Sequence, residues 1–176
     1  MDAPEYILTD EMETIVAAVK TALGLSVLNY QYGYITELNE TLKQMEAAPA
    51  QYQHKFPLVY LAEPFTISRG EERVFGTAKP DLFIINTTDK TWKAKQRMDN
   101  NYKPVLLPVY RQLLEEIKKS PVFQYMSTEK IVHTLTKGYY WGENQQSVLN
   151  DAVDCLKIGG IELPITHKSN CFISNF

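Results

Sequence analysis

The sequence of 176 residues contains little cysteine and little histidine. Its two cysteines, Cys155 and Cys171, form no CxxC motif, which argues against a disulfide framework and favours a reduced, cytosolic setting. The three histidines are far apart, and none belongs to an HxxxH or HExxH spacing. The histidine pattern therefore indicates no metal site.

Motifs for nucleotide binding and nucleophilic catalysis are missing as well. Neither GxxxxGK[ST] nor GxGxxG occurs, and there is no GxSxG nucleophile elbow. Acidic neighbours occur at Glu71–Glu72 and Glu115–Glu116, where we expect a turn and a helix surface rather than a paired-carboxylate site. We therefore expect no catalytic residue, no cofactor and no metal, and we interpret the chain as a non-enzyme.

Long hydrophobic runs are also absent, since the longest cover only a few residues, far short of a membrane span. The opening residues MDAPEY have neither a basic nor an apolar segment, so we expect no secretion signal and no membrane contact. The length suits a single domain over residues 1–176 with a substantial core.

Charge is distributed unevenly, although the net charge of −3 argues against general nucleic-acid binding. Residues 1–13 carry only acidic charges: Asp2, Glu5, Asp10, Glu11 and Glu13. Residues 90–103 contain one acidic residue, Asp99, and five basic residues: Lys90, Lys93, Lys95, Arg97 and Lys103. A solvated helix face would explain the basic run, and a local binding surface or head-to-tail association is the alternative.

Hydrophobic spacing predicts a first helix over residues 10–23, capped by Thr9 or Asp10 and ended by Gly24 in a left-handed conformation. Alternating tyrosines predict a strand within 25–34. A second helix is expected over 35–47, before Pro49. The eleven tyrosines suit interfaces as well as half-buried strands.

The two most apolar stretches of the sequence predict a central hairpin over 57–87. Pro57 and Pro64 should bracket its first strand, and Pro80 should mark a sheet edge or a bulge in the second. A helical region over 91–119 follows. Because it contains Pro104 and Pro108, we expect a basic helix near 91–102, a kink or break, and a second helix over 108–119.

The C-terminal third is expected to contribute strands over 130–166. Alternation predicts one strand over 130–140, and a turn at Gly159–Gly160 predicts a hairpin of 152–158 with 161–166. The tail 167–176 carries Phe172 and Phe176, which would dock on a neighbouring subunit or pack on their own domain. The predicted class is α+β, a mixed, mostly antiparallel sheet with helices packed on one face.

The central block resembles phage tail terminator and neck (head–tail completion) proteins, particularly those of phages and prophages of Bacteroides-type hosts. The resembling text is FPLVYLAEPF at 56–65 and GTAKPDLFIINTTDKTWKAKQRMDNNYKPVLLPVYRQLLEEI at 76–117. The order of elements resembles that family over about 10–165, which implies a tail-terminator-like fold.

The resemblance implies a structural virion protein, assembled in the host bacterial cytoplasm. It would form a ring, typically of six subunits, that terminates the tail tube and joins it to the head connector or other neck proteins, with possible DNA contact in the lumen. Such an interface would be heterologous and close by rotation. Our candidate interface residues are Arg69, Glu71, Glu72, Arg73, Lys90, Lys93, Lys95, Arg97, Phe172 and Phe176.

Besides an enzyme whose site residues only the fold brings together, which the absence of any titratable cluster disfavours, two alternatives stay open at this point. One is another head–tail connector ring protein, which differs only in the ring that it contacts. The other is a small DNA-binding accessory protein that uses the basic segment 90–103, for which a steep salt dependence of DNA affinity would be evidence.

Overall fold

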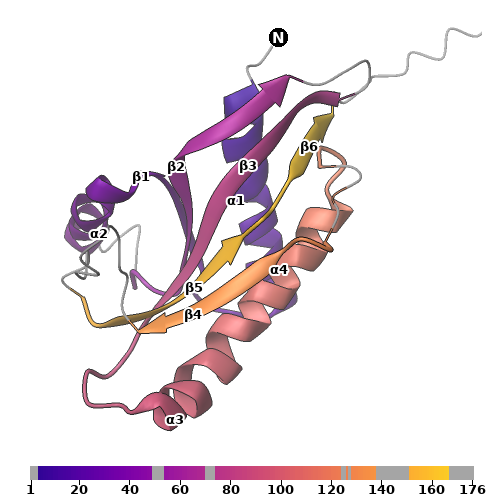
Figure 1. The fold of residues 1–176 in the computed structure, drawn as a ribbon. Helices are drawn as coiled ribbons and strands as arrows, with labels where there is room; N and C mark the ends of the chain where they lie inside the picture. Colours follow the sequence, from indigo (N-terminus) through magenta and orange to yellow (C-terminus); the bar gives the residue numbers. More distant parts are fainter. Residues whose placement is uncertain are drawn as a thin grey trace, which may run out of the picture.

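The computed structural model describes residues 4–48, 54–69, 74–123, 126, 128–137 and 151–166. Within these ranges six strands form one sheet in the order β1–β2–β3–β5–β4, and β6 pairs with β3 beyond the end of β5 (Figure 1). β1 runs parallel to β2, and every other pair is antiparallel, which confirms the predicted α+β class. The strands are β1 (Asn29–Tyr34), β2 (Leu58–Arg69), β3 (Val74–Thr87), β4 (Val132–Lys137), β5 (Val153–Gly159) and β6 (Leu163–Thr166).

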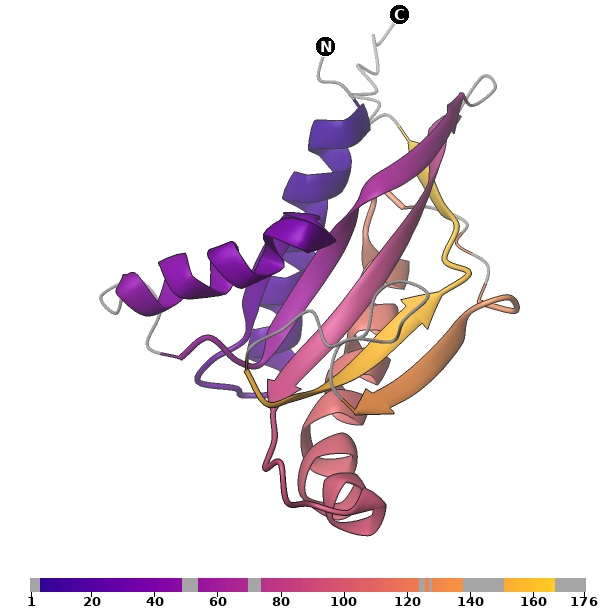
Figure 2. The same cartoon turned by 60° about the vertical axis from the view of Figure 1, so that its left-hand side comes forward.

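Helices cover both faces of this sheet, so the expectation of helices on one face alone is wrong. α1 (Pro4–Ala22) and α4 (Leu107–Lys119) pack on one face, whereas α2 (Leu38–Ala47), entered through the 3-10 turn η1 (Ile35–Glu37), crosses the other (Figure 2). The physical reason is that the central strands are apolar on both sides, as strands buried on both faces are. Val59, Leu61, Leu82 and Ile84 face α1 and α4, and Leu58, Tyr60, Phe83 and Ile85 lie on the face that α2 covers.

The first helix is longer than predicted, because it begins at Pro4 rather than at residue 10. Thr9 and Asp10 therefore lie inside α1, and neither caps it. Proline is favoured in the first turn of a helix, and the fully buried Leu8 extends the apolar stripe towards that start. Gly24 has φ +62°, which confirms the predicted left-handed end.

The central hairpin of β2 and β3 is confirmed, but Pro64 lies inside β2 instead of ending it. Ala62 is opposite Asp81 and Thr66 is opposite Lys79, so three residues of β2 face Pro80 alone. This bulge confirms the prediction for Pro80, which has no N–H to donate to the ladder.

Of the predicted kink or break in the helical region, the break is wrong, because one helical run continues from Ala94 to Lys119. It passes from α3 (Ala94–Arg97) through the π-helix η2 (Met98–Leu106) into α4. The Leu107 N–H donates to the Tyr102 carbonyl, five residues back. This wider turn accommodates Pro104 without ending the helix, and Pro108 lies in the first turn of α4.

The predicted C-terminal hairpin is also wrong, since β5 and β6 pair with β3 and not with each other. Ile158 is opposite Leu82 and Leu163 is opposite Ala78, so the two strands follow one another along β3. β3 has 14 residues and is long enough to pair with both. Gly160, at φ +72°, forms the bend between them. β4 lies within the strand predicted over 130–140, and residues 138–140 lie outside the described ranges.

Candidate assembly surfaces

The described residues offer little that could perform catalysis. No group of three or more His, Cys, Asp or Glu in these ranges is arranged to hold a metal ion. Cys155 is buried on β5, and burial raises the pKa of its thiol to about 12, so the thiol is protonated at neutral pH. The His133 ring on β4 packs against the Tyr110 ring, with centroids 4.8 Å apart.

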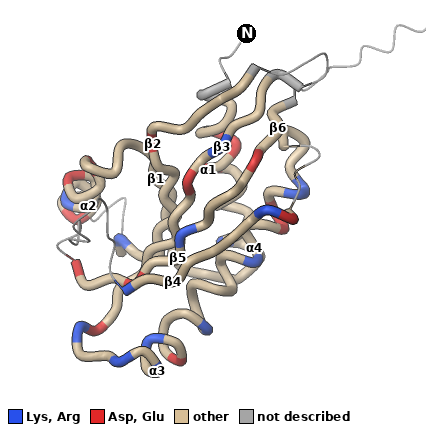
Figure 3. Tube along the Cα trace, viewed as in Figure 1, with Lys and Arg blue, Asp and Glu red and all other residues tan. Residues whose placement is uncertain are grey.

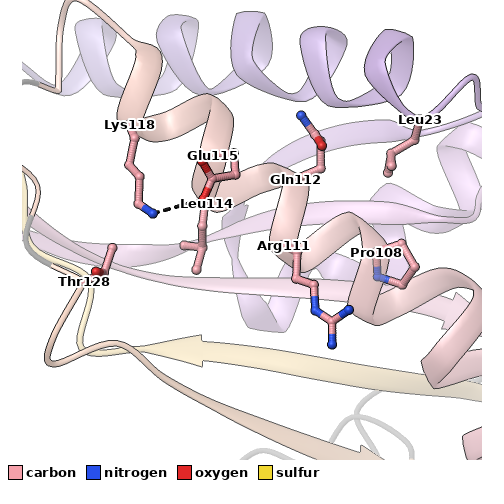
Figure 4. A pocket seen from close by; sticks show the side chains of 8 residues that line it. All are labelled: Leu23, Pro108, Arg111, Gln112, Leu114, Glu115, Lys118 and Thr128. Carbon is pink, nitrogen blue, oxygen red and sulfur yellow. Dashed lines mark hydrogen bonds and ion pairs between the residues drawn. The ribbon is translucent and has the colours of Figure 1, made fainter.

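A groove of about 510 Å³ runs along the outer side of α4 (Figure 4). Its lining includes the Lys118–Glu115 ion pair at 3.0 Å, together with Leu23, Pro108, Arg111, Gln112, Leu114 and Thr128. Both partners of that ion pair are exposed, so the attraction between them is weak. This lining contains no histidine or cysteine, and we assign it no chemical function.

Three predicted basic residues lie together at one end of the molecule. Lys90, Lys93 and Lys95 are exposed in the turn after β3 and in α3, and none forms an ion pair with another described residue. Lys103 lies on the same helical run and is paired with Asp99 at 2.7 Å. Figure 3 shows these lysine positions around α3, with acidic positions among them. The accessible positive charge is therefore smaller than the sequence count indicates.

Arg97 does not belong to this surface. Its guanidinium is 4% exposed and forms an ion pair with Asp154 of β5, which is fully buried. It also donates to Thr88 Oγ1 at 3.1 Å and to the Asp89 carbonyl at 2.9 Å. Asn101 donates to the other carboxylate oxygen of Asp154 at 2.9 Å. The arginine anchors the helical run to the sheet, so it is not accessible as an interface cation in this fold.

Of the remaining predicted interface residues, the structure describes only the backbone of Arg69. The backbone of Arg69 ends β2. Glu71, Glu72 and Arg73 lie outside the described residues. Phe172 and Phe176 also lie outside them, with the whole of 167–176. The two strands of the hairpin extend past β1, β4 and β5 at the end of the molecule where α1 begins, with β6 beside them, and α3 lies at the opposite end (Figures 1 and 2).

α1 begins at the end of the molecule opposite α3 (Figures 1 and 2). Asp10 and Glu13 are exposed on α1, and Glu11 accepts a hydrogen bond from Ser120 at 2.6 Å. α1 lies beside β1, and burial, with further contributions from Tyr32, Glu13 and Asp10, raises the pKa of Tyr30 on that strand.

The edge strands β1 and β4 are a further candidate surface, which the distribution of charge in the sequence did not indicate. Among the described residues, only β2 pairs with β1 and only β5 pairs with β4. Tyr32 and Tyr34 on β1 are 52% and 49% exposed, and Val132 on β4 is 62% exposed. The alternation of tyrosines predicted the strand, but only the sheet order identifies it as an edge.

Comparisons of this chain with models of known families, with curated proteins and with solved structures gave no match. No helix among the described residues is both long enough and apolar enough to cross a membrane.

Proposed function

We propose that this chain is a structural virion protein of the phage neck, which forms a ring that terminates the tail tube and joins it to the head connector. The proposal starts from the resemblance of residues 56–117 to tail terminator and neck proteins. The observation that supports it best is that, within the described residues, the sheet ends in two unlike strands, β1 and β4, each with a partner on one side only.

Unlike edges favour a ring over a symmetric pair. A two-fold dimer buries the same patch on both subunits, whereas contact between two different patches continues from copy to copy and closes when the rotation allows. β1 carries exposed tyrosines and no charged residue, and β4 carries valine, histidine, threonine and lysine. A contact of β4 with β1 of the next copy would leave neither edge strand unpaired.

The two ends of the subunit also differ, as the two sides of a neck ring must. The β2–β3 hairpin and the start of α1 lie at one end, and Lys90, Lys93 and Lys95 lie at the other. In the proposed ring the hairpin contacts one axial partner, either the tube or the connector. The lysines attract an acidic surface on the other partner.

The test is co-assembly with the tail tube protein and the head connector proteins of the same phage or prophage, imaged by negative-stain electron microscopy. We expect rings on the ends of tubes, and tubes of uncontrolled length when the chain is left out. Rings that bind only the connector would identify another connector component. A chain that binds neither tube nor connector would overturn the proposal.

Binding to DNA is the second candidate. It is favoured by Lys90, Lys93 and Lys95, which form no ion pair within the described part of the chain, and by the half-buried Trp92 among them. If those lysines neutralise phosphates, the logarithm of affinity should fall with the logarithm of salt concentration with a slope of at most about −3. Affinity that is steep in salt and lost in Lys93→Glu/Lys95→Glu would support this function. If the chain does not bind DNA even at low salt, a DNA-binding function is excluded.

A further inference from the structure

The backbone of β1 is arranged to accept another strand. The Asn29 N–H donates to the Pro57 carbonyl, next to β2, at 3.0 Å. Alternate residues of a strand direct their N–H and C=O groups to opposite edges, so those of Tyr30 and Tyr32 point away from β2. Exposed edges are commonly protected by charged residues or proline, and β1, with the sequence NYQYGY, has neither.

The opposite edge matches β1 in length and direction. β4 and β1 have six residues each. Along the sheet β1 and β2 are parallel, and each of the next three pairs is antiparallel, so β4 runs opposite to β1. Rotation about an axis along the strands preserves strand direction. The β4 of one copy would therefore meet the β1 of the next as an antiparallel pair, the more stable arrangement.

Tyr32 on β1 and His133 on β4 lie on the same face of the sheet. Tyr32 is level with Leu61, which faces α1 and α4. His133 is level with Ile158 and packs on Tyr110 of α4, so it faces the same side. The same rotation keeps this face on one side of the sheet in every copy. Tyr32 would then lie opposite or diagonal to His133, within the reach of an aromatic side chain.

We infer that β4 of one copy pairs antiparallel with β1 of the next copy, so that the sheet continues from subunit to subunit. This inference rests on the proposed ring and specifies its lateral contact. The occupant of the β1 edge is a second copy of this chain rather than another protein, because the chain itself carries a strand of matching length, opposite direction and the same face.

Cross-linking tests the contact directly. Cys171→Ser is the background, since Cys155 is buried. Tyr32→Cys and His133→Cys are each made in it and co-expressed with distinguishable tags, and a short thiol-to-thiol reagent is added. We expect a cross-link only between the two different variants. A cross-link within Tyr32→Cys alone or His133→Cys alone indicates a symmetric contact and overturns the inference. Tyr32→Cys with Glu40→Cys, exposed on α2, is the control expected to stay uncross-linked.

A proline variant separates backbone pairing from side-chain contact. Tyr32→Pro removes an outward N–H, and proline is tolerated in an edge strand when its nitrogen faces away from the sheet. We expect this variant to fold with a Tm close to that of Tyr32→Ala but to raise the dissociation constant of assembly by about tenfold or more relative to it. Equal assembly of the two variants overturns the strand pairing.

The outcomes separate this inference from the proposed function. Rings that bind the tube but show no cross-link between residues 32 and 133 would leave the proposed function standing and overturn the strand pairing. A chain that stays monomeric with and without tube and connector would overturn both. Strand pairing in rings that bind neither partner would support the contact and overturn the neck function.

Discussion

Arg97 in the short helix α3 and Asp154 on the interior strand β5 form a buried ion pair across 57 positions of sequence. The guanidinium also donates to Thr88, Asp89 and Trp92, and Asn101 completes the shell of the carboxylate. A buried charge is tolerated only when it is paired and hydrogen-bonded, and here both charges are. The pair fixes the π-helical run against the sheet and positions the lysine-bearing end.

Removing one partner of this pair should destabilise the fold strongly. Arg97→Met leaves the Asp154 carboxylate buried without its counter-charge, and we expect the free energy of unfolding to fall by about 3–5 kcal/mol. Lys95→Met, two positions earlier and exposed, is the matched control and should change it by no more than about 0.5 kcal/mol. Urea denaturation of both variants provides the comparison. If both variants lose the same free energy of unfolding, the Arg97–Asp154 ion pair does not contribute specifically to stability.

Two glycines with positive φ should differ in their tolerance of alanine. A Cβ at Gly24 would meet nothing within 4 Å, whereas a Cβ at Gly160 would lie 2.3 Å from the Lys130 carbonyl oxygen. Gly24→Ala should cost about 1 kcal/mol for the left-handed backbone alone. Gly160→Ala should cost on the order of 3 kcal/mol or more, because the backbone must also shift. Thermal unfolding measures both, and a cost at Gly160 no larger than at Gly24 would contradict the close approach of β5–β6 to Lys130.

The buried thiol of Cys155 should make the fold sensitive to alkaline pH. Its folded-state pKa is raised from 9.0 to about 12 by burial, so folding favours the protonated form. Below pH 9 that contribution is complete. Above pH 9 the unfolded chain ionises first, and the free energy of unfolding should fall by up to about 1.4 kcal/mol per pH unit from this group.

The Cys155→Ala variant isolates that contribution. Tyrosines with raised pKa values, such as Tyr60 and Tyr102, add their own loss at higher pH in both proteins. Urea denaturation at pH 8, 9 and 10 should therefore give a shallower decline for Cys155→Ala than for the unaltered chain, whatever the difference between them at pH 8. Parallel declines would show that the Cys155 thiol does not resist ionisation.

Periodicity in the sequence predicted those elements whose partners are near in the chain. The repeat of Leu38, Leu42 and Met45 predicted α2, and the two apolar runs predicted the β2–β3 hairpin. Arg97 was assigned to a basic surface because its partner Asp154 is 57 positions away and Lys93 and Lys95 are its visible neighbours. The burial of Arg97 depends on a partner that is distant in sequence, and local sequence patterns do not identify such a partner.

The same limit explains the other differences. The pair Gly159–Gly160 is as compatible with a bend as with a hairpin turn, and only the length of β3 decides between them. The tyrosines of β1 predicted a strand, but its edge position depends on the order of the whole sheet. The sequence therefore predicted the fold class and most elements, including β1 and β4, but not the edge positions of these two strands, which we propose as the lateral contact.

Charge reversal at the basic end should affect docking and not folding. Lys93→Glu/Lys95→Glu changes two exposed lysines that form no ion pair with any described residue, so we expect an unchanged Tm and at least about tenfold weaker binding to whichever axial partner meets that end. Lys43→Glu/Lys130→Glu makes the same change of net charge at exposed positions elsewhere. Pull-down at low and moderate salt compares the two. Equal weakening by both pairs would mean that net charge, rather than this end, decides binding.

The measurement that tests the account most directly is the mass of the purified chain in solution over a wide concentration range, alone and with tail tube protein, followed by negative-stain images of any large species. We predict one closed assembly, of six chains by the resemblance to tail terminators, visible as rings either free or on tube ends. A chain that remains a monomer at every concentration, and that also ignores the tube and the connector, would contradict the account.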